Sequence, residues 1–236
     1  MTDAAIKAMP SLTEGAYYAL RRDLLACHIK PGEKIKINEI ALQLGMNASA
    51  VREALARLSS EGLVQAEAQR GFRAAPVSIK DLRDLTTTRI KIEAICFEAA
   101  LAAGDVDWEA SIVAAFHKLI HLPEFTTTNG IDEVNEAWMR AHGDFHSALV
   151  SSCDSTWLMK IRSQLFAQSE RYRQLSVRFR LSVERAPYIK AQEDEHRAMM
   201  EAALSRDLKT MTDILDVHFS RTASFVETLA SESAWP

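Results

Sequence analysis

The sequence predicts a mainly α fold in two parts: a small N-terminal unit of helices closed by a hairpin, and an all-helical bundle. Residues 37–61 place apolar side chains at helical spacing, and residues 63–74 form two short apolar segments around a polar tip. Beyond residue 80 the chain shows only helical patterns joined by short connections. Residues 77–80 form the linker, so we expect domains at 1–78 and 79–236.

The N-terminal unit is expected to begin with a helix over residues 13–28. Ser11 and Glu14 have the spacing of a capping box at its start. A Pro-Gly pair at positions 31–32 then breaks the chain.

Residues 37–73 have the order helix, tight turn, longer helix and hairpin. Gly45 suits a turn that needs positive φ, Asn47 and Ser49 are both candidate N-caps for the longer helix, and Gly62 is placed to end it. The polar, glycine-containing tip covers residues 67–71. This order is typical of a winged helix-turn-helix.

Cations gather around this unit, which suits contact with DNA phosphates and entry of the longer helix into the major groove. We expect them to face one side, although ordinary solvated charges would give the same composition. They are Lys34, Lys36, Arg52, Arg57, Arg70 and Arg73.

The C-terminal part reads as a bundle of six helices without strands. The expected helices cover residues 81–104, 108–121, 131–151, 156–173, 187–205 and 207–231.

Composition excludes several classes of protein. With 236 residues, 47% hydrophobic and 25% charged, the chain can bury a core and is not disordered. It has no apolar run of 18 residues and no signal-peptide core, so we expect a cytoplasmic protein without a membrane partner. The three cysteines are widely spaced and are expected to be reduced core thiols. Residues 1–78 hold 10 Lys and Arg against 8 Asp and Glu, although the whole chain has a net charge of −4.

Four histidines fall on apolar faces of three expected helices. His142 and His146 are four residues apart and share a face, while His196 and His218 lie on the last two helices. If they converge, their imidazoles could bind zinc or another late first-row cation. The alternative is that each is a hydrogen-bonded core residue.

The N-terminal unit closely resembles the DNA-binding domain of GntR-type transcription regulators. The runs that carry the resemblance are PGEKIKINEIALQLGMNASAVREALARLSSEGLV and QRGFRAAPV. The resemblance implies that Arg52 contacts DNA, that the start of the longer helix faces the groove and that the tip near Gly71 approaches the minor groove or backbone. Ala48 stands where many members have a base-reading arginine. The expected DNA-contacting residues are Lys34, Lys36, Asn38, Asn47, Ala48, Ser49, Arg52, Arg57, Arg70 and Gly71.

The C-terminal part resembles the all-helical effector (FCD) domain of the FadR-type branch of that family. It carries HGDFHSAL at 142–149, EHRAMMEA at 195–202 and His218 near the end. The resemblance implies a divalent metal, zinc or alternatively nickel, held by His146, His196 and His218. His142 occupies the place where many members have Asp and is the expected fourth ligand. Asp144 points about 160° away from His146.

An imidazole in place of a carboxylate leaves such a site one unit more positive, which favours an anionic effector. Arg89, on the first bundle helix, could clamp a carboxylate, or it could simply pair with Glu93. Arg162, Arg171 and Arg173 are expected mostly on the solvated face.

These patterns predict a DNA-binding transcriptional regulator that acts as a repressor and is not an enzyme. A homodimer would bind an inverted repeat and respond to a small carboxylate or dicarboxylate. Similarity to members that repress glutarate and 4-aminobutyrate catabolism in enterobacteria points to a dicarboxylate. The alternatives are a metal-dependent helical hydrolase with an incidental helix-turn-helix, or a regulator whose histidines form a structural metal site or a dry core. Against the hydrolase, the chain has no HExxH and no glutamate evidently poised beside the histidines as a general base.

Overall fold

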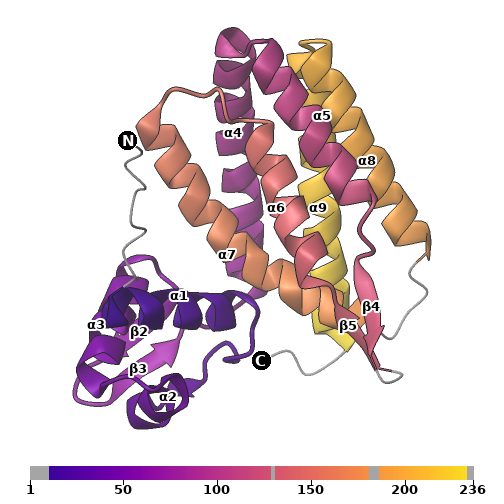
Figure 1. The fold of residues 1–236 in the computed structure, drawn as a ribbon. Coiled ribbons are helices and arrows are strands. Elements are labelled where there is room, and N and C mark those ends of the chain that lie inside the picture. Colours follow the sequence, from indigo (N-terminus) through magenta and orange to yellow (C-terminus); the bar gives the residue numbers. More distant parts are fainter. Residues whose placement is uncertain (1–10, 129–130, 181–185, 233–236) are drawn as a thin grey trace. The chain divides into compact units, whose positions relative to one another are not determined.

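The computed structural model describes residues 11–128, 131–180 and 186–232. The chain divides between Val77 and Ser78 into two compact units (Figure 1). Each unit has its own hydrophobic core. In the described part of the chain, no helix combines the length and apolar character that a membrane span requires.

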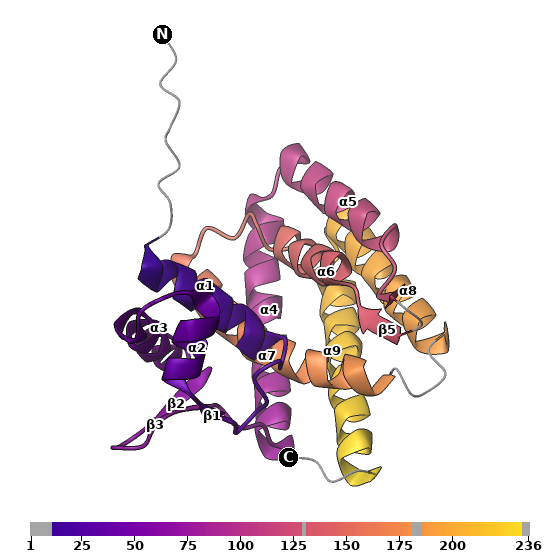
Figure 2. The ribbon, with the colours of Figure 1, turned by 60° about the horizontal axis from the view of Figure 1, so that its bottom comes forward.

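The first unit has the predicted winged helix-turn-helix. Its elements are α1 (Leu12–Leu25), β1 (Lys34–Ile35), α2 (Ile37–Leu44), α3 (Ala48–Ser60), β2 (Val64–Glu67) and β3 (Gly71–Ala74). The strands form an antiparallel sheet in the order β1-β3-β2, and the β2–β3 hairpin projects beyond the helices of this unit as the wing (Figure 2).

Local signals place these elements as expected. Ser11 and Glu14 form the capping box of α1. Gly45, at φ 63°, ends α2, and the side chain of Asn47, not that of Ser49, caps α3 by accepting from the Ala50 amide. The apolar face of α3 is fully buried, which fixes α3 against α1 and the wing.

The second unit is a helical bundle. Its helices are α4 (Ile79–Ala103), α5 (Val106–Ile120), α6 (Glu136–Ala148), α7 (Thr156–Arg180), α8 (Ala186–Leu204) and α9 (Leu208–Glu232). The side chain of Ser78 caps α4 by accepting from the Asp81 amide. In Figure 1, α4, α7 and α9 lie next to one another, and α5 and α6 pack together. The core between these helices includes Phe97, Ile112, Phe145 and Met199.

Two details of the bundle differ from the prediction. Strands β4 (Phe125–Thr128) and β5 (Ile131–Val134) form an antiparallel hairpin between α5 and α6, where no strand was expected. Helix α6 therefore begins at Glu136 instead of near residue 131, with Asn135 as its N-cap. Threonines are β-branched and favour strands, which explains why residues 125–128 are extended.

Candidate metal centre

The four histidines of the bundle converge. His142 and His146 come from α6, His196 from α8 and His218 from α9, and one ligand nitrogen from each lies within 4.8 Å of the others. Their ring centroids are separated by 4.6 to 6.2 Å. The i,i+4 spacing places the two α6 rings on one face, and packing of α8 and α9 brings the others opposite.

Burial keeps these imidazoles neutral. All four are buried, with at most 6% of any residue exposed. Loss of solvation, with smaller contributions from neighbouring histidines and arginines, lowers the pKa of His142, His146 and His196 well below the ordinary value. The same burial, assisted by nearby Arg89, lowers the pKa of His218 to about 3. Neutral imidazole has a lone pair available for a cation.

Several of the histidine nitrogens have no hydrogen-bond partner among the described residues. They are Nε2 of His146, Nε2 of His196 and both ring nitrogens of His142. Buried polar atoms without partners are rare because each is destabilising, and a cation would satisfy one nitrogen on each ring. Neutral nitrogen donors suit zinc and its neighbours, so the residues fit a divalent metal.

Glu195 orients one of these rings. The Nδ1–H of His218 donates to Oε2 of Glu195 at 2.9 Å, and Arg221 pairs with the other carboxylate oxygen. Burial raises the pKa of Glu195, while Arg221 opposes that shift. A glutamate therefore does lie beside one of the histidines, where it accepts a hydrogen bond from the ring and orients it.

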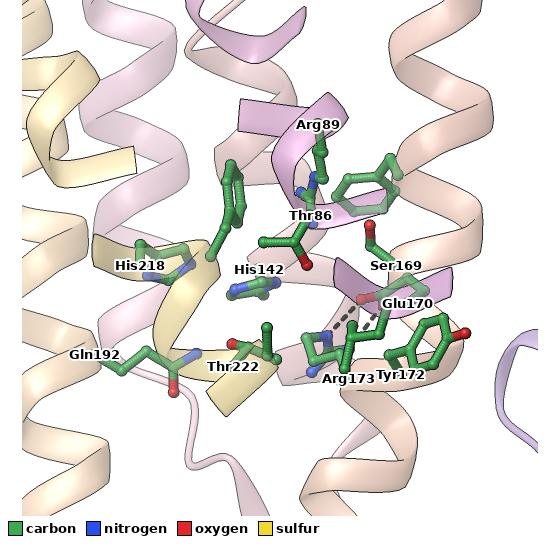
Figure 3. A pocket seen from close by; sticks show the side chains of 14 residues that line it. Thr86, Arg89, His142, Ser169, Glu170, Tyr172, Arg173, Gln192, His218 and Thr222 are labelled. Atoms are coloured by element: carbon green, nitrogen blue, oxygen red, sulfur yellow. Dashed lines mark hydrogen bonds and ion pairs between the residues drawn. The ribbon is translucent and has the colours of Figure 1, made fainter. Parts of the chain in front are cut away.

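A small cavity of about 40 Å³ adjoins the cluster (Figure 3). Its walls include His142 and His218, the Arg89 side chain of α4, and uncharged polar groups. The uncharged polar residues are Thr86, Ser169, Tyr172, Gln192 and Thr222, none of which the sequence pattern singled out.

Arg89 belongs to a buried network. Its Nε lies 3.4 Å from Oε1 of Glu93, and its guanidinium stacks over Phe219 at 4.0 Å. Arg162 contacts the other Glu93 oxygen at 2.7 Å and donates to the backbone carbonyl of His146 at 2.7 Å. Arg89 therefore makes the intrahelical pair and also lines the cavity.

The expectation that Arg162, Arg171 and Arg173 are solvated is wrong, because all three are buried. Their partners lie within the bundle: Glu93 binds Arg162, Gln168 binds Arg171, and Glu170 binds Arg173. Asp144 is exposed, in agreement with the expected helical angle.

Most of the expected DNA-contacting residues are accessible in the first unit. The exposed ones are Lys34, Lys36, Asn38, Asn47, Ser49, Arg52, Arg57, Arg70 and Gly71, while Ala48 is half-buried. Arg52 forms no ion pair with the described residues, whereas Lys36 pairs with Glu39. Gly71, at φ 93°, starts the returning strand of the wing.

The cations do not all face one side. Arg57 lies about 140° around α3 from Arg52, and its guanidinium covers the ring of Tyr17 on α1 at 3.8 Å. Arg73 pairs with Glu67 at 2.9 Å across the wing and donates to the Gly32 carbonyl. Both contacts are internal to the unit.

Residues 12–73 match the family described as bacterial regulatory proteins, gntR family, and residues 84–221 match the FCD domain. The chain is 36% identical over 216 residues to the HTH-type transcriptional regulator BphR of Paraburkholderia xenovorans, covering 92% of this chain and 85% of the relative. It is 30% identical over 203 residues to the HTH-type transcriptional repressor GlaR of Escherichia coli, covering 86% and 90%.

Solved structures share the fold. E. coli McbR/YncC superimposes with a TM-score of 0.77 at 19% identity, covering 94% of this chain and all of the other. A GntR regulator from Rhodococcus sp. RHA1 gives a TM-score of 0.69 at 17% identity, covering 93% and 99%. The family and these relatives are transcriptional regulators, which does not favour the hydrolase alternative. The chain belongs to the GntR family of bacterial regulatory proteins and is a transcriptional regulator with a C-terminal FCD effector-binding domain.

Proposed function

We propose that the protein is a transcriptional repressor whose affinity for DNA is controlled by a small carboxylate bound at a metal in the FCD domain. The observation that carries this proposal is the cluster of four buried, neutral imidazoles next to a cavity that Arg89 lines. The repressor role is supported by the similarity to GlaR, which is named a transcriptional repressor.

On the DNA side, Ser49 and Arg52 form an exposed edge of α3, and Arg70 and Gly71 form the tip of the wing. We infer that α3 enters the major groove from this edge, with the wing against the backbone or minor groove. The proposed surface also includes Lys34, Lys36, Asn38, Asn47 and Ala48. Arg57 contributes less, because its guanidinium is held over Tyr17.

We infer that the protein binds DNA as a homodimer on an inverted repeat, because a two-fold protein pairs naturally with a palindromic operator. Each winged unit would contact one half-site.

On the effector side, His142, His146, His196 and His218 would hold a divalent cation, zinc or alternatively nickel. When bound, the cation supplies a Lewis-acidic site for a carboxylate oxygen. All four ligands are neutral, so the full positive charge of the ion remains to attract an anion. Arg89 lines the same cavity, and its guanidinium adds a second group suited to a carboxylate.

The size of the cavity limits the effector. At about 40 Å³ it accommodates only a few water-sized groups, so a compact mono- or dicarboxylate fits better than a large ligand. Binding would favour one arrangement of the helices, and a coupling of roughly 1–3 kcal/mol is enough for a 5- to 150-fold change in DNA affinity.

The proposal is tested with an operator selected from random duplex DNA by the metal-loaded protein. The dissociation constant for that duplex is then measured at fixed salt with and without acetate, succinate or glutarate, before and after metal removal by a chelator. We expect at least one carboxylate to change DNA affinity only in the metal-loaded protein. An identical response after chelation would refute the role of the metal, and no response to any carboxylate would refute the effector class.

A further inference from the structure

The hydroxyl of Tyr172 on α7 is bonded to the first residue of the second unit. It accepts from the Ser78 amide at 3.1 Å and donates to Oδ2 of Asp81 at 2.6 Å, across 94 and 91 residues of sequence. Only 2% of Tyr172 is exposed. Burial and the bond to Asp81 raise the pKa of this hydroxyl, so it keeps its proton at neutral pH. The backbone that enters α4 is therefore fixed to α7 through one side chain.

The same side chain lines the cavity beside the histidines. Figure 3 shows the hydroxyl of Tyr172 pointing away from His142, so the ring lies between the cavity and the start of α4. The two helices that this hydroxyl joins both contribute walls to the cavity. These walls include Leu82, Thr86 and Arg89 of α4, and Ser169 and Arg173 of α7. Leu82 and Thr86 lie only about one and two helical turns after Ser78.

The small size of the cavity makes a bound ligand act on these walls. At about 40 Å³ it has little room beyond a carboxylate group, and packed interiors do not compress, so a ligand with more atoms displaces a wall. A shift of α7 against α4 changes the geometry of the bonds from Tyr172 to Ser78 and Asp81, and hydrogen bonds weaken steeply when they are misaligned. Val77 is the last residue of the winged unit, so a change at Ser78 acts on its point of attachment.

We propose that Tyr172 couples the effector cavity to the DNA-binding unit, because its ring lines the cavity while its hydroxyl fixes the backbone at Ser78. This inference rests on the proposed function, since it needs a ligand in the cavity that changes DNA affinity. Tyr172 is a positioning residue: it acts on DNA through Ser78 and does not contact the metal ligands by a hydrogen bond.

Two variants that each lose one buried hydroxyl of α7 test the proposal. Tyr172→Phe removes the bonds to Ser78 and Asp81 and keeps the ring. The matched control is Ser176→Ala, whose hydroxyl bonds only to the Arg173 carbonyl of the same helix. The dissociation constant for the selected operator is measured at fixed salt, with and without acetate, succinate or glutarate, on zinc-loaded protein. Calorimetry measures carboxylate affinity in parallel.

The coupling, which is the ratio of the two DNA dissociation constants, should separate the variants. We expect a ratio of roughly 5- to 150-fold for the wild-type protein and for Ser176→Ala, and of less than about 2-fold for Tyr172→Phe. Carboxylate affinity should remain within about 3-fold of wild type in both variants, because the lost hydroxyl points away from the cavity. A merely structural hydroxyl would lower the melting temperature without changing this ratio.

The outcomes distinguish the two levels of the account. If the wild-type protein responds to none of the three carboxylates, the proposed function fails, and this inference fails with it. If the wild-type protein responds and Tyr172→Phe responds equally, only the inference is overturned. Loss of the response in Ser176→Ala as well would also overturn it, because the loss would then follow from general destabilisation.

A measurement on the wild-type protein covers the case in which Tyr172→Phe folds poorly. Hydrogen–deuterium exchange of the Ser78 amide, which donates to Tyr172, is followed in the absence of DNA. The carboxylate that changes DNA affinity should change this exchange rate several-fold. An exchange rate that stays the same when this carboxylate binds would overturn the inference.

Discussion

His218 and Glu195 form a hydrogen bond of 2.9 Å between Nδ1 and Oε2, and Arg221 holds the other oxygen of the same carboxylate. This bond places the ring hydrogen on Nδ1, so Nε2 of His218 carries the lone pair toward the cluster. The four clustered side chains are all imidazoles. The nearby negative charge is on Glu195, which is hydrogen-bonded to His218 and is not itself a member of the cluster. The centre therefore has neutral ligands and an anionic support.

Removing that support should weaken the metal site. Glu195→Gln is expected to lower metal affinity by about 10- to 100-fold, because the neutral amide oxygen is a weaker acceptor for the Nδ1–H of His218 and no longer raises the basicity of the ring. Competition with a metal indicator measures the affinity. The matched control is Glu201→Gln on the exposed face of the same helix, which should leave the affinity unchanged. Equal affinities for the two variants would remove Glu195 from the account.

Acid should destabilise the metal-free protein more steeply than an ordinary bundle. The pKa of His218 is about 3 in the folded protein and 6.5 in the unfolded chain, so the unfolded chain binds the proton first as pH falls. The contribution of His218 to the free energy of unfolding is therefore complete above pH 6.5. Below that pH it falls by about 1.4 kcal/mol per pH unit for each such histidine. The pKa values of His142, His146 and His196 are lowered in the same direction and add to the slope.

Urea unfolding at pH 7.5, 6.5 and 5.5 measures this slope. The three pH values span the range in which the unfolded histidines take up protons. A free energy of unfolding that stays constant between pH 6.5 and 5.5 would show that the buried rings do not remain neutral.

Two arginines of α3 should behave differently. Arg52→Ala is expected to abolish specific operator binding while leaving the fold intact, because its side chain is exposed and makes no ion pair with the described residues. Arg57→Ala is expected to lower the free energy of unfolding by roughly 0.5–1 kcal/mol through loss of the stacking on Tyr17, with a smaller effect on DNA. Fluorescence anisotropy at fixed salt and thermal unfolding report on the two effects. The opposite ranking of DNA affinities would place the other edge of α3 in the groove.

The buried ion pair should matter more than exposed ones. Arg162→Met leaves the buried carboxylate of Glu93 with a weaker set of partners and is expected to cost about 3–5 kcal/mol of stability. Arg83→Met, which breaks the exposed pair with Glu227, should lower the free energy of unfolding much less, because solvent screens that pair. Denaturant unfolding compares the two variants. Similar losses would mean that Glu93 is compensated without Arg162.

Much of the fold could be predicted because its signals are local. The capping box at Ser11, the left-handed glycine at 45 and the Asn47 cap each act within a few residues. The β4–β5 hairpin was missed although a threonine run and Asn129-Gly130, a strong hairpin signal in sequence, were present. Residues 129–130 lie outside the described part of the chain. The helical pattern that follows was read too far toward the N-terminus.

The site was predicted only in part, for a physical reason. The spacing of His142 and His146 shows that they share a face, but convergence with His196 and His218 depends on how three helices pack. The burial of Arg162 could not be read from its own helix, because its partner Glu93 lies 69 residues away. The same holds for the polar residues that line the cavity.

The central claim is that a carboxylate binds the bundle through the metal, and the melting temperature tests it most directly. Thermal unfolding is recorded with and without a saturating carboxylate, on zinc-loaded and on chelator-treated protein. At about 100 times its dissociation constant, a ligand adds about 2.7 kcal/mol, which raises the melting temperature of a chain of this size by roughly 5–10 °C. We predict that rise for zinc-loaded protein alone. A rise of the same size after metal removal, or no rise with zinc bound, would contradict the account.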